Sequence, residues 1–427
     1  MLRLALHWQI LIGMVIGAAI GLPLNILAEL GHVEETIPRT VAGYGEAIGG
    51  LFLRLLSMIV VPLIMTSLIS GVTAAGNLEG LGRLGGRTLV YYLSTSLIAI
   101  VIGIVFVNVI RPGEGVDLGI LTAQVAPAGH DVEAKTLGQT LWGLLESLIP
   151  TNVFHVMADA GNRSILGVIF FSLLFAVFII VVGGEAGALL TRVMAAAFDV
   201  MMKMTLFIIR FAPIGVLGFM LYATAGVGLR IFAALSWYML TVFLALCCHA
   251  FITLPLALWL IARRSPKEYF KAMSPALLTA FSTASSNGTL PLTLTCVEKR
   301  AGVPNRISSF VLPLGATINM DGTALYEAVA VLFIAQIAGV DMSLGNQVVI
   351  AITALLASIG AAGIPHAGTV MMLVVMNAVG LPTEYVGIIL AVDRILDMCR
   401  TTVNVWSDST AAAVVARLEG SPPADSA

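Results

Sequence analysis

The stretch STASSNGTLP (282–291) decides how this chain folds, because it is a polar break inside an apolar region. Apolar halves of about 12–15 residues flank it, and each is too short to cross a hydrocarbon core roughly 30 Å thick. ASIGAAGIPHAGT (357–369) interrupts another apolar region in the same way. In lipid an unpaired backbone group costs several kcal/mol, so such tips persist only inside protein or beside water. We therefore expect two re-entrant helical hairpins.

Each expected hairpin is followed by a helix that carries polar groups at membrane depth. The first precedes PLGATINMDGTALYEAV (313–329), and the second precedes AVDRILDMCRTTVNVWSDST (391–410). A unit of broken hairpin and polar helix thus occurs twice. Interrupted apolar segments in corresponding positions are typical of secondary transporters built from inverted repeats.

The rest of the chain predicts an all-α polytopic membrane protein. Of its 427 residues 59% are hydrophobic and 11% are charged, whereas soluble domains average about 25% charged. Neither an ordinary soluble enzyme nor a disordered chain fits this composition, and a net charge of −2 excludes a nucleic-acid partner. Six further apolar runs are long enough to span the bilayer: 8–29, 45–74, 88–110, 163–183, 190–222 and 230–262.

Basic loops predict the orientation of these spans. Lys and Arg concentrate at 76–87, 263–271 and 299–306, whereas the loops at 29–46 and 111–135 carry more acid than base. Threading the spans alternately puts the basic loops and the N-terminus on one side, which we expect to be cytoplasmic. The four cysteines lack metal or redox spacing, so no cofactor is expected. A multi-pass protein of a prokaryotic inner (plasma) membrane is predicted.

The last helix concentrates the ionisable groups, which are expensive in a bilayer and therefore candidates for function. Helical spacing places six side chains on about one stripe: Asp393, Asp397, Arg400, Thr401, Asn404 and Asp408. The chemical complement of this stripe is a zwitterion with an extra acid. Asp397 can hold an ammonium, Arg400 can fork onto a side-chain carboxylate, and Asn404 can donate to an α-carboxylate. The alternative is an internal Asp397–Arg400 ion pair.

The helix at 313–329 predicts a cation site. Its glycines favour unwinding, and unwound carbonyls with Asn319 and Asp321 oxygens suit a hard cation such as Na⁺; the alternative is a kinked packing helix. Glu327 is a candidate proton carrier or a satisfied buried acid. The hydroxyls of Tyr92, Thr95 and Ser96 lie at one-turn spacing, although most such clusters only bond the preceding backbone.

These motifs together resemble the dicarboxylate/amino acid:cation symporter family, also called the glutamate transporter family. The match covers nearly the whole chain, and its diagnostic parts are SSNGTLP, PLGATINMDGTALYEAV, SIGAAGIPHAG and VDRILDMCRTTVNVWSD. The resemblance implies eight spanning helices, two re-entrant hairpins, a homotrimer and an elevator motion. It also implies scaffold helices in 1–87, a transport helix and exposed loop in 88–135, two scaffold helices and one transport helix in 136–262, and the transport core in 263–427.

The resemblance also implies site residues. For the substrate they are Ser286, Thr323, Gly368, Asp397, Arg400, Thr401 and Asn404. For sodium they form three sets: Gly315, Asn319, Asn404 and Asp408; Thr317, Ser358, Ile359 and Ala361; and Tyr92, Thr95, Ser96, Asn319 and Asp321.

The chain departs from the family pattern at several positions. Asn287 stands where many relatives have Ser, and a second arginine that relatives often carry is missing at Ala284 and Met398. Arg394 resembles the branch that moves C4-dicarboxylates, but that branch usually lacks an acid at the Asp397 position.

Sodium-coupled symport of glutamate or aspartate is therefore expected, with a C4-dicarboxylate:cation symporter as the alternative. The sequence also leaves a passive channel as an alternative interpretation. An intramembrane aspartyl protease using Asp321 and Asp397 fits poorly, since no GxGD context surrounds either acid. The protein is expected to be no enzyme, and its partners are the acidic substrate, Na⁺ and the bilayer.

Overall fold

The computed structural model describes residues 6–34, 36–74, 81–114, 142, 146, 149–158, 165–228, 230–360 and 367–420, and every regular element in them is helical. Most of the expected loop at 111–135 lies outside this part. The N-terminal half contains these elements: α1 (Leu6–Glu29), α2 (Thr36–Ala74), η1 (Leu81–Gly85), α3 (Gly86–Ile110), α6 (Val153–Ala158), α7 (Ile165–Val182), α8 (Gly184–Ile209) and α9 (Ala212–Val227).

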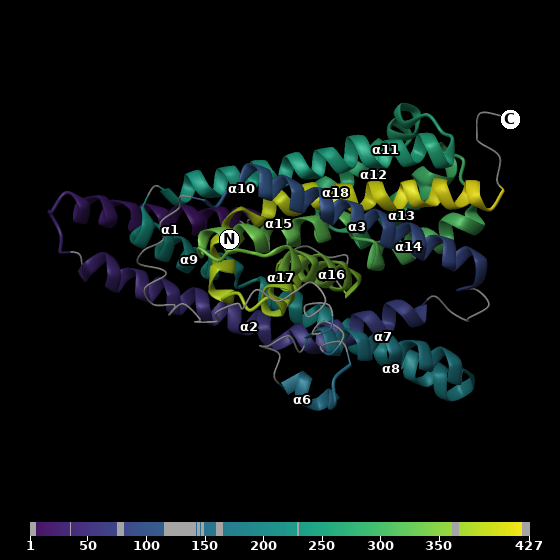
Figure 1. The fold of residues 1–427 in the computed structure, drawn as a ribbon, viewed down its shortest axis with the longest axis horizontal. Helices are drawn as coiled ribbons and strands as arrows, with labels where there is room; N and C mark the ends of the chain where they lie inside the picture. Colours follow the sequence, from purple (N-terminus) through teal and green to yellow (C-terminus); the bar gives the residue numbers. More distant parts are fainter. Residues whose placement is uncertain are drawn as a thin grey trace, which may run out of the picture.

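Helices α1, α2 and α7 to α9 form one side of the molecule (Figure 1). Both α1 and α2 pack along α9, and α2 also packs against α7 and α8. Glycines make the closest of these approaches: a Cβ on Gly17 would lie 2.6 Å from the Leu217 carbonyl oxygen, and one on Gly45 would lie 2.6 Å from that of Gly218. Small residues let helix backbones approach in this way in lipid, where packing drives association.

The predicted span at 190–222 is formed by two helices rather than by one continuous helix. The chain turns at Arg210 and Phe211, and α8 and α9 are bent by 48° at that break. Pro213 lies in the first turn of α9, where its missing N–H costs nothing, so it favours a new helix start. The predicted spans at 8–29, 45–74, 88–110 and 230–262 each coincide with helix, and within 163–183 helix α7 occupies Ile165–Val182.

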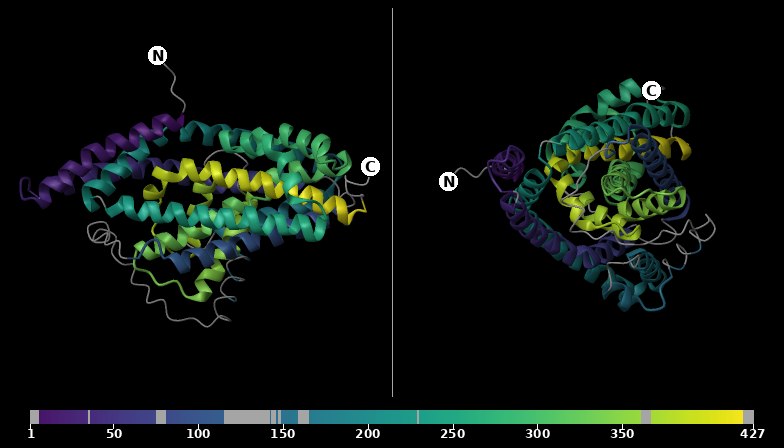
Figure 2. Two further views of the ribbon diagram at one scale, coloured as in Figure 1. Left: turned by 90° about the horizontal axis from the view of Figure 1, so that it is seen from above. Right: turned by 60° about the vertical axis from the view of Figure 1, so that its left-hand side comes forward.

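The C-terminal half contains the remaining helices: α10 (Arg230–Cys248), η2 (His249–Thr253), α11 (Leu254–Ala257), η3 (Leu258–Ala262), α12 (Pro266–Thr283), α13 (Ser286–Thr295), η4 (Cys296–Arg300), α14 (Asn305–Ile318), α15 (Asp321–Ile337), α16 (Leu344–Gly360), α17 (Ala367–Ala378), η5 (Thr383–Tyr385) and α18 (Val386–Leu418). Helix α15 packs against α3, α10, α16, α17 and α18. It therefore lies at the centre of this half, ringed by other helices (Figure 2).

The first break forms a tight helical hairpin, as the sequence predicts. Ala284 ends α12 in the left-handed region at φ +50°, and the Ser285 side chain caps α13 by accepting from the Gly288 N–H. Two residues thus reverse the chain, and α12 packs against α13. At the second break α16 packs against α17, while the connecting residues 361–366 lie outside the described part.

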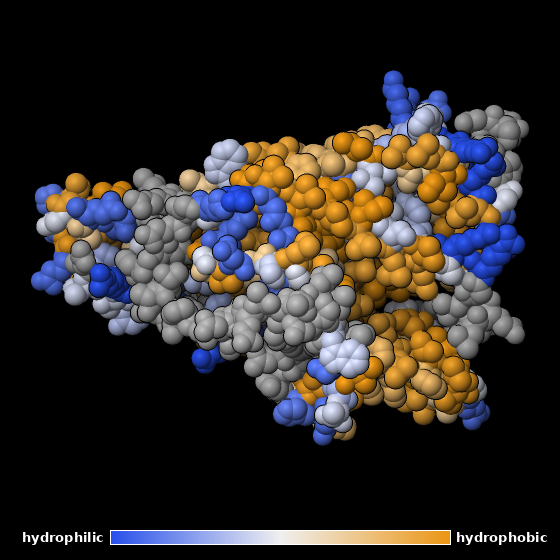
Figure 3. All heavy atoms as spheres, in the orientation of Figure 1, coloured by the Kyte–Doolittle hydropathy of each residue, from blue (hydrophilic) through white to orange (hydrophobic). Residues whose placement is uncertain are grey.

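The surface is that of a protein surrounded by lipid. Hydrophobic side chains cover the middle of the face over α3 and α10, and hydrophilic ones gather toward the ends (Figure 3). Within the described residues five helical stretches are long and apolar enough to cross a bilayer, or six if the bent α8–α9 pair counts as one span. Helix α18 is longer than a span, but the ionisable groups along it make it unusually polar.

Candidate functional site

The candidate site is built around the break between α14 and α15. The Asn319 N–H still bonds the Gly315 carbonyl, but Asn319 is extended (φ −104°, ψ 90°), and the helix restarts only at Asp321. This is the unwinding that the sequence predicts. The restart brings α15 against α18 very closely, because a Cβ on Gly322 would lie 2.5 Å from the Arg400 carbonyl oxygen. Only glycine permits this crossing.

Arg400 of α18 is fully buried and held by two carboxylates. Its Nη1 donates to Asp393 Oδ1 at 2.9 Å, and its Nε donates to Asp397 Oδ1 at 3.0 Å. The guanidinium also lies over the Tyr326 ring, 4.2 Å from its centroid, and the Tyr326 hydroxyl donates to Asp393 at 2.8 Å. Of the two arrangements the sequence allows, the structure therefore has the internal Asp397–Arg400 ion pair, reinforced by Asp393.

Asn404 connects α18 to the start of α15. Its Oδ1 accepts from the Gly322 N–H at 2.8 Å, and its Nδ2 donates to the Thr323 hydroxyl at 3.1 Å. At the start of α17, a Cβ on Gly368 would lie 3.0 Å from Thr323 Cγ2 and 3.1 Å from Arg400 Cζ. Together with Asp397, which bonds Arg400, five of the predicted substrate residues on three helices therefore lie together.

The other two predicted substrate residues lie on α18 and α13. Thr401 is buried on α18, one residue after Arg400. Ser286 is buried at the first position of α13, and α13 packs against α18. Asp397 also faces a second cation, since Arg394 Nη1 lies 3.9 Å from its Oδ2.

A second centre is the carboxylate of Asp321, which is completely buried. Its Oδ1 accepts from the Ser96 hydroxyl at 2.5 Å and from the Thr95 hydroxyl at 3.4 Å. Its Oδ2 accepts from the Ser407 hydroxyl at 2.6 Å and lies 3.0 Å from His249 Nε2. The predicted hydroxyls of α3 thus reach Asp321 rather than only their own backbone.

A third centre is the carboxylate of Asp408, one turn beyond Asn404. Asn319 Nδ2 donates to Asp408 Oδ1 at 2.8 Å, while Asn319 Oδ1 is buried without a hydrogen-bond partner. A Cβ on Gly315 would lie 2.5 Å from Asp408 Oδ1 and 2.7 Å from the Tyr92 hydroxyl. Amide, phenol and carboxylate oxygens thus lie close together, and oxygen ligands of this kind suit a hard cation.

The remaining predicted residues are placed as follows. The Thr317 hydroxyl donates to the Leu314 carbonyl at 2.9 Å, and the Ser358 hydroxyl donates to the Leu355 carbonyl at 2.9 Å. Ile359 follows Ser358 on α16, which packs against α14, and Ala361 lies outside the described residues. Glu327 is completely buried on α15, and neither of its carboxyl oxygens has a hydrogen-bond partner.

Comparison with known proteins agrees with this architecture. The model of the sodium:dicarboxylate symporter family matches residues 6–418. The chain belongs to that family. The family is one of transporters rather than enzymes, and the expected resemblance is confirmed.

Three relatives share about a third of their residues with this symporter-family chain. Excitatory amino acid transporter 3 of Mus musculus is 36% identical over 467 residues, covering 96% of this chain and 86% of the relative. Excitatory amino acid transporter 3 of Homo sapiens is 37% identical over 423 residues, covering 87% and 78%. Excitatory amino acid transporter 2 of Homo sapiens is 34% identical over 461 residues, covering 96% and 78%.

Sequence reasoning missed several residues of the symporter-family site. Asp393 was placed on the polar stripe but given no partner, although its distance of seven residues from Arg400 is two helical turns. Tyr326 and Ser407 lie inside the quoted polar motifs but are not assigned a role there, and His249 carries no signal of its own because it is a single ionisable residue in an apolar run. Among the described residues no three His, Cys, Asp or Glu side chains cluster as a transition-metal site would require.

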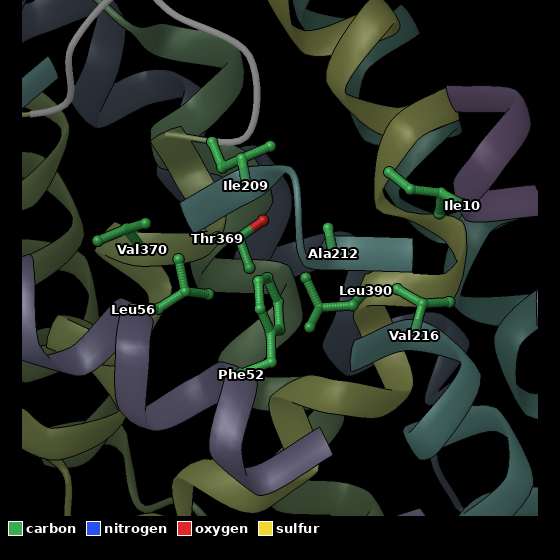
Figure 4. A pocket seen from close by; sticks show the side chains of 9 residues that line it. All are labelled: Ile10, Phe52, Leu56, Ile209, Ala212, Val216, Thr369, Val370 and Leu390. Carbon is green, nitrogen blue, oxygen red and sulfur yellow. The ribbon is translucent and has the colours of Figure 1, made fainter. Parts of the chain in front are cut away.

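The symporter-family chain also has an apolar pocket between its two halves. Nine residues line it: Ile10, Phe52, Leu56, Ile209, Ala212, Val216, Thr369, Val370 and Leu390. Thr369, next to Gly368, supplies the single side-chain oxygen in this lining (Figure 4). The pocket therefore lies beside the polar centres without containing any of their charged groups.

Proposed function

We propose that this chain is a sodium-coupled symporter of acidic amino acids, glutamate or aspartate. The observation that carries the proposal is the pair of buried carboxylates, Asp321 and Asp408. Within the described residues neither forms an ion pair with Lys or Arg. Buried charges are costly unless they are paired or bind a metal ion. Sodium ions on the oxygens around each carboxylate would supply the missing positive charge.

Arg400 and Asp397 support the choice of substrate. A glutamate or aspartate carries two carboxylates and one ammonium, so it can replace the internal ion pair group for group. Its side-chain carboxylate would take the Arg400 guanidinium, and its ammonium would take Asp397. Asp393 and the Tyr326 ring would keep Arg400 in place during this exchange, so the arginine needs little reorganisation.

The positions of two helix starts support binding of the second carboxylate. The first turn of α15 at Gly322 and Thr323 and the first turn of α17 at Gly368 lie beside Arg400. Helix N-termini carry a partial positive charge and free N–H groups, which favour an anion. Asn404 would donate to the α-carboxylate from the opposite side.

Asn404 also offers a route for coupling. It bonds both Gly322 and Thr323 at the substrate side, and it lies one turn from Asp408 at the cation side. A ligand on either side would therefore fix the same amide. Closing the α16–α17 hairpin over both ligands would make occupied sites a condition for movement and suppress leak.

The larger assembly is also proposed. In it α1, α2 and α7 to α9 form a scaffold, and α3, α10 and residues 263–427 form a part that carries substrate across by an elevator motion. Three copies would assemble through their scaffolds in the plasma membrane. The apolar pocket between the two halves supports this division, since its lining has no side-chain oxygen or nitrogen other than that of Thr369 to tie the halves together.

A C4-dicarboxylate symporter is the second candidate, and Arg394 favours it. Its guanidinium lies 3.9 Å from Asp397 Oδ2 and partly balances that acid, which would otherwise repel a plain dicarboxylate. Competition separates the two candidates. Succinate that displaces labelled aspartate as well as glutamate does would establish the second function.

The proposal is tested by uptake into proteoliposomes with Na⁺, K⁺ and pH varied separately. Uptake of aspartate against its gradient should vanish when choline replaces Na⁺. Arg400→Cys should abolish uptake of acidic substrates, because it removes the buried guanidinium that would hold the side-chain carboxylate of the substrate as a bidentate pair. Arg417→Cys, in the last turn of the same helix, is the matched control and should leave uptake intact. Unchanged aspartate uptake in Arg400→Cys would refute the assignment.

A further inference from the structure

His249 is a buried polar side chain that the proposed transport cycle does not yet use. It lies on the first residue of η2, where the long helix of α10 to η3 passes α18 (Figure 1). Its side chain is completely buried, Nε2 lies 3.0 Å from Asp321 Oδ2, and Nδ1 has no hydrogen-bond partner. No other basic group pairs with Asp321 among the described residues.

His249 lies where η2 interrupts the regular α-helical hydrogen bonding that follows α10. In this segment the Leu254 N–H bonds the carbonyl of His249, five residues back, so the helix contains a π-type bulge. Such bulges insert one extra residue into a turn and occur frequently at functional sites. The bulge also leaves the Ala250 carbonyl accessible to Trp406 Nε1, which donates to it at 3.0 Å. Helix α18 thereby clamps the bulge beside Asp321.

The four groups around Asp321 divide between its two oxygens. Thr95 and Ser96 contact Oδ1, whereas Ser407 and His249 contact Oδ2. Because Oδ2 is hydrogen-bonded by groups from two different helices, the Asp321 carboxylate cannot rotate freely. Its other oxygen, Oδ1, therefore keeps a fixed direction. That direction is toward the α3 hydroxyls, which are the expected cation ligands.

We infer that His249 is a positioning residue for sodium: its Nε2–H holds Asp321 Oδ2 so that Oδ1 is presented, with Thr95 and Ser96, to the ion. This inference rests on the proposed sodium coupling. It requires the neutral ring with the proton on Nε2, which leaves only an acceptor, Nδ1, without a partner. Partners of metal ligands act in this way, and their loss typically lowers metal affinity roughly 10–100-fold.

The test compares two substitutions that have nearly the same length and differ in hydrogen-bonding capacity. His249→Met removes the donor, whereas His249→Gln keeps an N–H that can reach the carboxylate. We expect His249→Met to raise the half-saturating Na⁺ concentration for aspartate uptake about tenfold, at the lower end of that range. His249→Gln should raise it less than threefold. The KM for aspartate at saturating Na⁺ should change less than twofold in both variants, which a general packing defect would not produce.

Thr241→Val is the matched control, because Thr241 is a buried residue of α10 whose hydroxyl bonds only the Trp237 carbonyl of its own helix. It should leave Na⁺ dependence unchanged. Equal Na⁺ dependence in His249→Met and His249→Gln would overturn the inference. Uptake by the unaltered protein that needs no Na⁺ would instead overturn the proposed function.

A measurement on the unaltered protein covers the case in which His249→Met does not fold. In ¹⁵N spectra of histidine-labelled protein, the signal that His249→Gln removes should show a neutral ring protonated at Nε2. A ring protonated only at Nδ1 would overturn the inference, since its Nε2 lone pair would then face a carboxylate.

Discussion

Asp408→Asn offers the sharpest prediction about the cation centres, because it removes one charge and little else. The amide has the shape of the carboxyl group, and its oxygen can still accept from Asn319 Nδ2, which lies 2.8 Å from Asp408 Oδ1. Contacts of a charged group contribute about 1.5–3 kcal/mol, against about 0.5–1.5 kcal/mol for a neutral one. The midpoints of these ranges differ by about 1.3 kcal/mol, and a loss of that size in Na⁺ binding corresponds to a roughly ninefold higher half-saturating Na⁺ concentration.

The same change should act in the opposite direction on the Na⁺-free protein. Asp408 is buried without Lys or Arg among the described residues, so its charge costs folding free energy when no cation is bound. We expect Asp408→Asn to raise the free energy of unfolding in choline chloride by about 1 kcal/mol. In saturating NaCl the variant should gain about 1.3 kcal/mol less from the ion than the unaltered protein does, since the stabilisation follows RT ln(1 + [Na⁺]/Kd).

Uptake into proteoliposomes and thermal unfolding in both salts measure these two effects. Ser409→Ala is the matched control, because the Ser409 hydroxyl is buried next to Asp408 but donates only to the Trp406 carbonyl of its own helix. A half-saturating Na⁺ concentration within twofold of the unaltered protein would refute the assignment of Asp408 as a cation ligand. A loss of stability in choline chloride would refute the view that its charge is uncompensated.

Two further predictions concern α15. Gly322→Ala would place a methyl group 2.5 Å from the Arg400 carbonyl oxygen and should lower the free energy of unfolding by about 1–3 kcal/mol, as overpacking does. Thermal unfolding measures this change. Gly43→Ala is the control, because a Cβ at Gly43 would have no neighbouring atom within 4 Å. Glu327→Gln should flatten the dependence of aspartate uptake on external pH while leaving the half-saturating Na⁺ concentration within twofold. An unchanged pH profile would show that Glu327 is only a buried acid.

Much of the fold is readable from the sequence because lipid penalises broken helices. The polar tip at 282–291 and the glycines around Asn319 have few explanations at membrane depth other than a hairpin and an unwound segment, and the structure has both. The break at Arg210 was not predicted because hydropathy stays high across it. A helix that bends within an apolar run changes direction without changing composition.

The sequence likewise predicts one part of the candidate site and leaves another part undecided. Spacing alone places Asp397, Arg400 and Asn404 on one stripe, but it cannot decide whether Arg400 bonds its own helix or a guest. The structure shows Arg400 bonded to Asp393 and Asp397. His249 is not predicted because it is a single ionisable residue in an apolar run, and no periodic pattern reveals its contact with Asp321 on another helix.

The gap at Asn319 and Met320 reverses electrical polarity within two residues. The carbonyl end of α14 is a partial negative pole, and the amide end of α15 is a partial positive pole. A cation would therefore bind at the α14 side of the gap and an anionic substrate at the α15 side. Each would be attracted by the other as well as by the backbone. With only the cation or only the substrate bound, one of the two helix ends would lack an opposite charge. The backbone would therefore favour binding of both ligands together, independently of the side chains.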